Sequence, residues 1–482
     1  MSGTDRKKQY KHKAHDAAAL RSKRREAEGE LRKEKREKLV NAKRARVDEA
    51  HQDLDDVTME EVTKATSLFH KSSKTQHEKL TILKRAFAQG TVYIDHFMQT
   101  ENAVDQLIGL LSGNDADVQL DAAWCVTNIA TGTDDHAYAM AKVAGPYLVT
   151  FLSGSNHMLQ DQCAWALGNI AGDGPKCRDL VIQQGALPPL VQLLQAPQPS
   201  LVQSAAFALS NMIRGDGANT KALVDLGAVP LLLKHITLQE DNQALVSEVC
   251  WVLTYLAVSG DHEKELVDGG FLETLATLLV AVSNTQEHNI QILTPALRCL
   301  GNVCSGPNEI TQRICQNKEL VPALGRFLHS DHHHVRKECL WALSNMTGDT
   351  SVCQSVLDHG LLAPIIALLG TSFDIKREAV YCLCNLAYQG PNFCQEMLKA
   401  GVVQGVVPLL KSTDIDVTHV SLSFVEMMLR LTDNAKKIFE EAGGMGALEL
   451  LEYHSNEQLR AQTNDLLEKY FYTQPVDMHD NQ

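Results

Sequence analysis

One apolar motif recurs seven times between residues 122 and 389. The copies are AAWCVTNIATG, CAWALGNIAGD, AAFALSNMIRG, VCWVLTYLAVS, ALRCLGNVCSG, CLWALSNMTGD and AVYCLCNLAYQ. Their third residues lie 40 to 47 residues apart, at Trp124, Trp165, Phe207, Trp251, Arg298, Trp341 and Tyr381. Unrelated amphipathic helices would not produce seven copies in register. The period therefore predicts a solenoid built from helical repeats.

A second apolar element, opened by glycine, precedes most copies. These glycines are Gly185, Gly227, Gly270, Gly360 and Gly401. Glycine past the end of one helix and proline near the start of the next are ordinary stop and start signals. A period of roughly 40 to 47 residues is typical of armadillo or HEAT repeats. We expect an all-α solenoid of about ten repeats of the armadillo or HEAT type, preceded by a basic helical arm.

Charge divides the chain into a basic arm and an acidic body. Residues 1–47 contain 17 Lys and Arg against 7 Asp and Glu, a balance of +10, and the rest of the chain carries −24. Such an arm can fold back onto the body or bind another acidic partner. The expected parts are a basic segment (1–47), an acidic flexible linker (48–61), the repeat domain (62–472) and a disordered tail (473–482).

Several classes of protein are disfavoured by the sequence. No apolar run approaches the roughly 20 residues of a membrane helix, and the first 30 residues are too charged for a secretory signal. Twelve cysteines without a CxxC pair indicate reduced thiols in the cytosol or nucleus. No P-loop, HExxH motif or serine elbow occurs, so neither an enzyme nor a cofactor is expected. The run His332–His334 is interpreted as a solvated loop rather than a metal site, because no spaced fourth ligand accompanies it.

Five motif copies place an asparagine four residues after an aromatic residue, on the same face of a helix. The pairs are Trp124/Asn128, Trp165/Asn169, Phe207/Asn211, Trp341/Asn345 and Tyr381/Asn385. One interpretation is structural, with each aromatic ring buried and each Asn capping a neighbouring turn. The other is a peptide groove, in which the amides bond an extended backbone and the aromatic faces hold aliphatic stems that end in a cation. Carboxylates near the slots would select Lys and Arg; they are Asp173, Glu248, Glu338 and Glu378.

The aromatic–Asn ladder is interrupted in its middle. Tyr255 replaces the asparagine of one copy, and Arg298 replaces the aromatic residue of the next. Because a cation in the ladder repels cationic ligands, two separate sites are predicted. The larger uses Trp124, Trp165 and Phe207, and the smaller uses Trp341 and Tyr381.

At this level of detail the chain resembles importin-α, the adaptor for nuclear localisation signals. The motifs that carry the resemblance are AAWCVTNIATGT, CAWALGNIAGDGPKCRDLV, TPALRCLGNV and LEKYF, and the basic N-terminus is similar to the importin-β-binding segment. The resemblance implies that the repeats form a right-handed superhelical armadillo-repeat solenoid and that the protein shuttles between cytoplasm and nucleus. Its partners would be importin-β, cargo with basic signals and possibly an export receptor, with no membrane and no direct nucleic acid.

The resemblance also implies roles for individual residues. The major signal-binding site would comprise Trp124, Asn128, Gly132, Trp165, Asn169, Asp173, Phe207 and Asn211. In it, Asp173 and the Gly132 carbonyl would bind the key lysine. The minor site would comprise Trp251, Tyr255, Arg298, Asn302, Thr311, Glu338, Trp341, Asn345, Glu378, Tyr381 and Asn385. The cluster Lys43, Arg44 and Arg46 would act as an autoinhibitory ligand that leaves when importin-β binds the basic helix.

Some positions depart from the importin-α pattern. Phe207 and Tyr381 stand where Trp is usual, Ala137 where Thr is usual and Ser204 where Asn is usual, and the usual acidic tail after LEKYF is missing. Two stretches, LRCLGNVCS and CLCNLAYQGPNFCQ, are similar to a divergent vertebrate relative named as a transmembrane and coiled-coil protein. That relative lacks most of the Trp–Asn array, which favours a working adaptor here. The alternatives are a scaffold of importin-α descent with reduced or specialised cargo binding and a catenin-type scaffold, whose groove would be basic.

Overall fold

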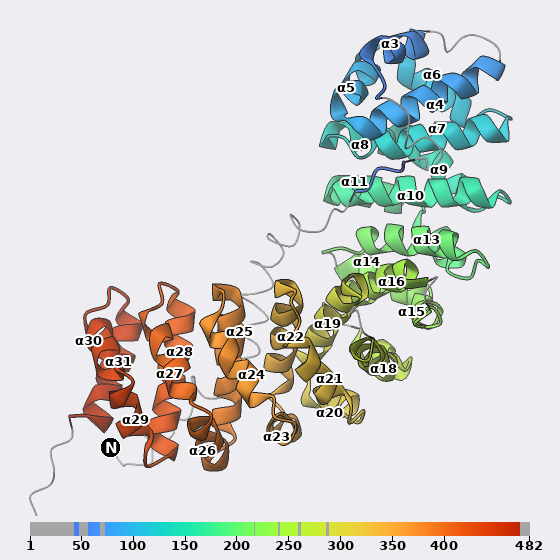
Figure 1. The fold of residues 1–482 in the computed structure, drawn as a ribbon. Helices are drawn as coiled ribbons and strands as arrows, with labels where there is room; N and C mark the ends of the chain where they lie inside the picture. The colour runs from blue at the N-terminus through green and yellow to red at the C-terminus, as the bar shows by residue number, and fades with distance from the viewer. Residues whose placement is uncertain are drawn as a thin grey trace, which may run out of the picture. The chain divides into compact units, whose positions relative to one another are not determined.

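The computed structural model describes residues 43–47, 56–67, 73–215, 217–239, 242–258, 262–285 and 289–472. Within these ranges the regular structure is helical, and no strand occurs (Figure 1). The chain divides into two compact units, one ending at Thr274 and the other continuing from Leu275. We call them the N-terminal unit and the C-terminal unit. The predicted basic helix, most of the predicted linker and the predicted tail lie outside the described residues.

The N-terminal unit contains the following helices: α3 (Met59–Ser67), α4 (Ser73–Gln89), α5 (Thr91–Gln99), α6 (Ala103–Leu111), α7 (Ala116–Ile129), α8 (Asp134–Val143), α9 (Gly145–Leu152), α10 (His157–Asp173), α11 (Pro175–Gln183), α12 (Leu187–Leu193), α13 (Pro199–Met212), α14 (Gly217–Asp225), α15 (Ala228–Leu233), α16 (Gln243–Leu256) and α17 (Glu263–Asp268). Helix α3 begins within the stretch assigned to the linker. The boundary between the units falls inside α18 (Phe271–Ser283).

The C-terminal unit continues with α19 (Ile290–Cys304), α20 (Asn308–Ile314), α21 (Leu320–Phe327), α22 (His333–Met346), α23 (Thr350–Asp358), α24 (Leu362–Ala367), η3 (Leu368–Gly370), α25 (Phe373–Tyr388), α26 (Pro391–Lys399), α27 (Val402–Val406), η4 (Val407–Lys411), α28 (Ile415–Leu431), α29 (Ala435–Glu441), α30 (Gly444–Glu452) and α31 (Glu457–Tyr470).

Within each unit, the last helix of each repeat packs against the last helix of the next, and we call these the ladder helices. They are α4, α7, α10, α13 and α16 in the N-terminal unit and α19, α22, α25, α28 and α31 in the C-terminal unit (Figure 1). All seven motif copies fall on ladder helices. Ten ladder helices correspond to ten repeats, so the predicted all-helical armadillo-repeat fold is confirmed.

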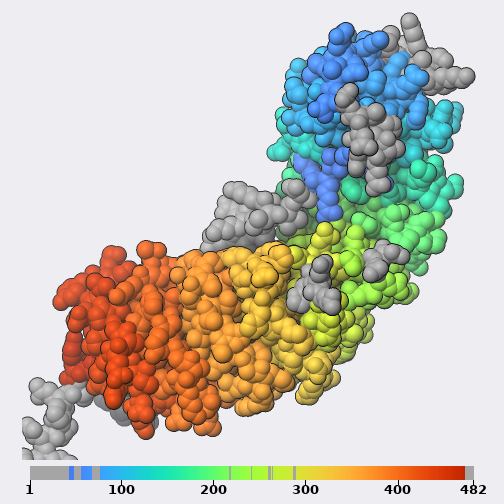
Figure 2. All heavy atoms as spheres, in the orientation of Figure 1, coloured from blue at the N-terminus to red at the C-terminus, as the bar shows by residue number. Residues whose placement is uncertain are grey.

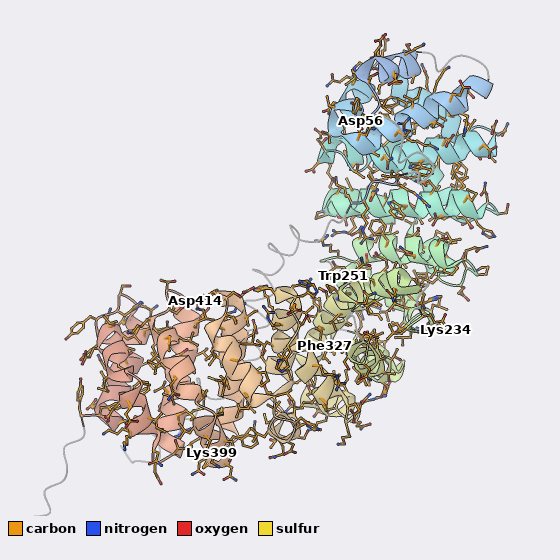
Figure 3. All side chains as sticks on the ribbon, in the orientation of Figure 1. Asp56, Lys234, Trp251, Phe327, Lys399 and Asp414 are labelled. Carbon is orange, nitrogen blue, oxygen red and sulfur yellow. The ribbon has the colours of Figure 1, made fainter. Side chains whose placement is uncertain are left out.

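Local sequence explains where the ladder helices begin and where their partners end. The carboxylate of Asp115 accepts hydrogen bonds from the backbone N–H groups of Asp117 and Val118 at the start of α7, and Asn156 caps α10 in the same way. Gly227, with φ 73°, ends one helix in the left-handed conformation that suits glycine, as predicted. The apolar face of each helix is then buried between layers, as Phe327 is on α21 (Figure 3).

Candidate peptide-binding groove

Residues 43–47 form a non-helical segment that lies across α7 and α10 (Figure 2). The indole N–H of Trp124 donates to the carbonyl oxygen of Arg46 at 2.9 Å, and that of Trp165 donates to the carbonyl oxygen of Arg44 at 2.8 Å. Successive ladder helices therefore bond every second residue of the segment. This alternation is the geometry of an extended peptide.

The ladder asparagines pair with the same two residues. Arg46 donates its backbone N–H to Asn128 Oδ1 at 2.9 Å and accepts from Asn128 Nδ2 at 3.0 Å. Arg44 makes the corresponding bonds with Asn169 at 2.8 and 2.9 Å. Because each amide satisfies one donor and one acceptor of the backbone, it binds the extended segment independently of the segment's side chains.

Each ladder asparagine is also fixed by the preceding ladder helix. Its Nδ2 donates to a carbonyl oxygen one repeat earlier, at 2.7 to 3.1 Å, and the pairs are Asn128 with Lys84, Asn169 with Thr127, Asn211 with Gly168, Asn345 with Gly301 and Asn385 with Ser344. A buried amide needs such partners. The side chains of Asn128 and Asn169 thus join neighbouring repeats and also bond the backbone of the extended segment.

Lys43 enters a pocket formed by α10 and the turn after α7. Its ammonium group lies 2.5 Å from Asp173 Oδ1 and donates to the carbonyl oxygen of Gly132 at 2.9 Å. The Asp173 side chain is only 5% exposed, so this ion pair is largely shielded from water. On the other side, the Cys177 thiol donates to Asp173 Oδ2 at 3.4 Å, and burial together with this carboxylate raises the pKa of Cys177 to about 12.

Arg46 is held between two indole rings. Its Cζ lies 5.4 Å from the Trp124 ring centroid and 5.1 Å from that of Trp165, and its Nη2 lies 2.6 Å from Asp161 Oδ2. The Ser204 hydroxyl donates to Asp161 Oδ1 at 2.6 Å and so orients the carboxylate. This slot combines cation–π stacking with an ion pair, which suits a planar guanidinium.

Arg44 has the equivalent slot one repeat further along the chain. Its Cζ lies 4.8 Å from the ring centroid of Phe207, and its Nη1 lies 2.5 Å from Glu248 Oε1. Burial raises the pKa of Glu248, although the Arg44 charge and hydrogen bond oppose that shift. Glu248 is therefore a desolvated carboxylate whose ionised form depends on a cation beside it.

Sequence reasoning missed Asp161 and did not connect Glu248 with a particular cation. Asp161 lies four residues before Trp165, on the same face and one turn earlier, so helical spacing provided a signal. Trp251, which Figure 3 labels, and Tyr255 were assigned to the minor site, but both lie on α16 of the N-terminal unit. Their ring centroids are 6.0 Å apart. Ala137, where threonine is usual, is fully buried.

The remaining minor-site residues lie in the C-terminal unit, where the main feature is an ion pair within the ladder. Arg298 Nη2 lies 2.7 Å from Glu338 Oε1, with side chains 12% and 7% exposed. Glu378 is completely buried and accepts from the Ser344 hydroxyl at 3.5 Å and from Arg377 at 3.4 Å. Two carboxylates predicted to select cargo are thus engaged by the chain's own side chains.

The other predicted minor-site residues differ in their surroundings. Trp341 is 7% exposed, and Tyr381 and Asn302 are half-buried. Thr311 is fully buried on α20, and its hydroxyl has no hydrogen-bond partner among the described residues.

The sequence analysis expected the histidine run to lie in a solvated loop, but His333 and His334 begin α22 and His332 is the residue just before it. His333 bonds the Ser372 hydroxyl at 2.7 Å and Asp374 Oδ1 at 3.1 Å. Burial alone would raise the pKa of Asp374, but Lys337, Ser372 and His333 hold it at about 2. Among the described residues, no group of three or more His, Cys, Asp or Glu side chains is placed to hold a metal ion.

The family model named TMCO6 matches residues 63–471. Importin subunit alpha-9 of Arabidopsis thaliana is 34% identical across 77% of this chain and 74% of its own length. Importin subunit alpha-2 of Oryza sativa subsp. japonica is 31% identical across 93% of this chain and 92% of its own length. The chain belongs to the TMCO6 family of importin-α relatives. The sequence analysis found similarity to a divergent relative only in LRCLGNVCS and CLCNLAYQGPNFCQ. The match to the TMCO6 family model extends that similarity through residues 63–471 of this TMCO6-family chain.

A solved structure gives a further match to the TMCO6-family chain. The crystal structure of an engineered protein superposes with a TM-score of 0.76 and 28% identity, covering 86% of this chain and 99% of that protein. Within the described residues, no single helix has both the length and the apolar character to cross a bilayer. By length and composition, α23 and the segment Leu362–Gly370 reach that threshold only as a pair bent by 93°.

Proposed function

We propose that this chain is a nuclear import adaptor whose N-terminal unit binds basic nuclear localisation signals as extended peptides. The single observation that supports the proposal most is the position of Lys43. Its ammonium group meets Asp173 and the Gly132 carbonyl while Asn169 pairs with the next residue. A groove that accepts the chain's own Lys-Arg-Ala-Arg sequence is built for cargo of the same chemistry.

In this proposal, residues 43–47 are an autoinhibitory ligand that cargo must displace. The segment belongs to the same chain, so its effective concentration at the groove is high. Importin-β would bind the predicted basic helix of residues 1–47, withdraw the segment and free the groove. Release of importin-β in the nucleus would return the segment and help to eject cargo. The protein would accordingly move between cytoplasm and nucleus, with an export receptor as a further possible partner.

The groove proposal is tested on the full chain by replacing Lys43, Arg44 and Arg46 with alanine together. Fluorescence anisotropy with a labelled Lys/Arg-rich peptide should show affinity raised by about tenfold or more at low salt. The gain should shrink as salt rises, because the competing contacts are largely ionic. Equal affinities of the parent and the variant at low salt would contradict autoinhibition.

Two matched controls accompany this measurement. Alanine at Lys221, Lys399 and Lys437 removes the same charge from exposed ion pairs on other surfaces and should leave peptide affinity unchanged. Asp173→Lys, added to the triple alanine variant, should remove most binding, at a cost of about 2–5 kcal/mol for a desolvated pair. Retained affinity in that variant, with an unchanged circular dichroism spectrum, would place the signal elsewhere.

A second candidate is a scaffold of importin-α descent with reduced cargo binding. The observation that favours it is confined to the C-terminal unit, where Arg298 already pairs with Glu338. Under this alternative, the N-terminal groove holds residues 43–47 permanently. Adding importin-β to the full chain distinguishes the two functions, because only the adaptor should then gain peptide affinity.

A further inference from the structure

The N-terminal groove ends at Trp124, where a resident lysine occupies the outer face of the last indole ring. Lys84 Nζ lies 4.6 Å from the Trp124 ring centroid, on a side chain only 7% exposed. Arg46 stacks on the same ring system at 5.4 Å. Trp124 thus contacts two cations, one from the extended segment and one from α4.

Lys84 also engages a carboxylate of α7, the helix that carries Trp124. Its Nζ lies 2.9 Å from Asp121 Oδ1, and His77 Nδ1 lies 2.5 Å from Asp121 Oδ2. Asp121 stands three residues before Trp124, the same place that Glu248 holds before Trp251. Glu248 binds Arg44 of the extended segment. The equivalent position at the groove end is therefore already paired within the solenoid.

The ladder itself does not continue beyond this point. Asn169 bonds the carbonyl of Thr127, the residue before Asn128, and Asn128 in turn bonds the carbonyl of Lys84. Lys84 is therefore the counterpart of Thr127 one repeat earlier. It follows that Arg85 and Thr81 on α4 stand at the places that Asn128 and Trp124 occupy on α7. Neither residue provides an indole face or an amide. A ligand side chain beyond Arg46 would meet Lys84 and its buried ion pair.

We propose that Lys84, held by Asp121, is a specificity-determining residue that closes the groove and rejects a basic residue two positions after the Arg46 equivalent. Successive residues on one side of an extended peptide lie two apart, so Arg44 and Arg46 fill neighbouring slots and residue 48 follows. The chain's own residue at that position is Asp48, and Glu49 comes next. The groove would thus select a Lys-Arg-x-Arg cluster followed by a neutral or acidic residue. This inference rests on the proposed function.

The test uses the full chain with alanine at Lys43, Arg44 and Arg46, which leaves the groove open to added peptide. Three peptides carry the Lys-Arg-Ala-Arg cluster and differ only in having Asp, Ala or Lys at the position equivalent to 48. The Lys form should bind about tenfold more weakly than the Asp form at low salt, because like charges meet in a partly desolvated site. Equal binding of the three peptides would overturn the inference, whereas absence of any binding would overturn the proposed function instead.

Substitution of Lys84 then assigns the discrimination to this side chain. Lys84→Met retains the carbonyl that holds Asn128 and removes the Lys84 charge from Asp121, which keeps the His77 ring beside it, so the Lys form should become at least as tight as the Asp form. Lys84→Met/Asp121→Asn removes both charges and should abolish discrimination without reversing it. Lys142→Met is the matched control, because Lys142 on α8 makes the same kind of contact, with its Nζ 4.6 Å from the Tyr138 ring centroid. An unchanged order of the three peptides in both Lys84 variants would overturn the proposal.

Discussion

The two units share one ladder of amides but differ in where the cations come from. In both units, each ladder asparagine bonds a carbonyl of the preceding repeat. In the N-terminal unit, Asp173 and Glu248 pair with Lys43 and Arg44 of a separate extended segment. In the C-terminal unit, Glu338 pairs with a cation of the ladder itself. The asparagine is thus retained in both units, while the cation that pairs with the nearby carboxylate varies from copy to copy.

This difference shows that a carboxylate beside the ladder does not by itself indicate a ligand site. Asp121 and Glu338 occupy the same place in their repeats as Glu248, three residues before the lead position. Lys84 and Arg298 neutralise the first two. Only a carboxylate without such a resident cation can provide the long-range attraction that selects a basic peptide.

The largest effect that separates the units should come from Arg298→Ala. It leaves the Glu338 carboxylate, only 7% exposed, without this cation, and breaking a buried pair from one side costs about 3–5 kcal/mol. Hydrogen exchange should report the loss in α19 and α22, and chemical denaturation should shift to lower denaturant. Lys399→Ala, which breaks an exposed pair with Glu396, should change stability by less than about 0.5 kcal/mol. If the two variants are equally stable, the Arg298–Glu338 ion pair does not stabilise the fold.

A smaller effect is expected from Glu248→Gln in the N-terminal unit. On the chain with alanine at Lys43, Arg44 and Arg46, which is the parent for this comparison, loss of the charge-assisted bond to the peptide arginine that takes the place of Arg44 should weaken peptide binding by about 1.5–3 kcal/mol. Because burial raises the pKa of Glu248, the ionised form is disfavoured in the folded protein, and the neutral amide should not lower the free energy of unfolding. Calorimetry with the basic peptide and denaturant unfolding measure the two quantities separately.

The same substitution makes a prediction about pH. A raised pKa means that Glu248 takes up a proton at a higher pH than an ordinary glutamate. As pH falls through that raised value, the carboxylate loses its charge, so the parent protein loses peptide affinity while its fold gains relative stability. The Gln variant should lack this component of the pH profile. Identical profiles for parent and variant would show that Glu248 is not the group that titrates.

The repeat architecture could be predicted from the sequence because it depends on period alone. Seven copies in register placed Trp124 and Asn128 on a ladder helix, and glycines such as Gly227 marked helix ends. The charge pairing could not be predicted in the same way. Asp161 and Lys84 act through contacts between adjacent repeats, and the choice between a resident and an external cation depends on side-chain geometry rather than on spacing.

The smallest effect tests whether the aromatic position explains part of the difference between the units. Phe207 packs on Gly168 of the preceding ladder helix, and Trp341 packs on Gly301 in the equivalent arrangement. The second pair shows that a glycine one repeat earlier accommodates an indole. Phe207→Trp should therefore fit, and a larger π-face should strengthen the contact with the peptide arginine that takes the place of Arg44 by about 0.5–1 kcal/mol.

Calorimetry with the basic peptide, on the full chain with alanine at Lys43, Arg44 and Arg46, measures the effect of Phe207→Trp. Gly168→Ala is the opposing control, because a Cβ there would lie 2.6 Å from the Phe207 ring and 3.2 Å from the Ala208 backbone. That variant should displace the ring and weaken binding. Weaker binding by Phe207→Trp as well would mean that the ring at this position packs in the core and does not contact the ligand.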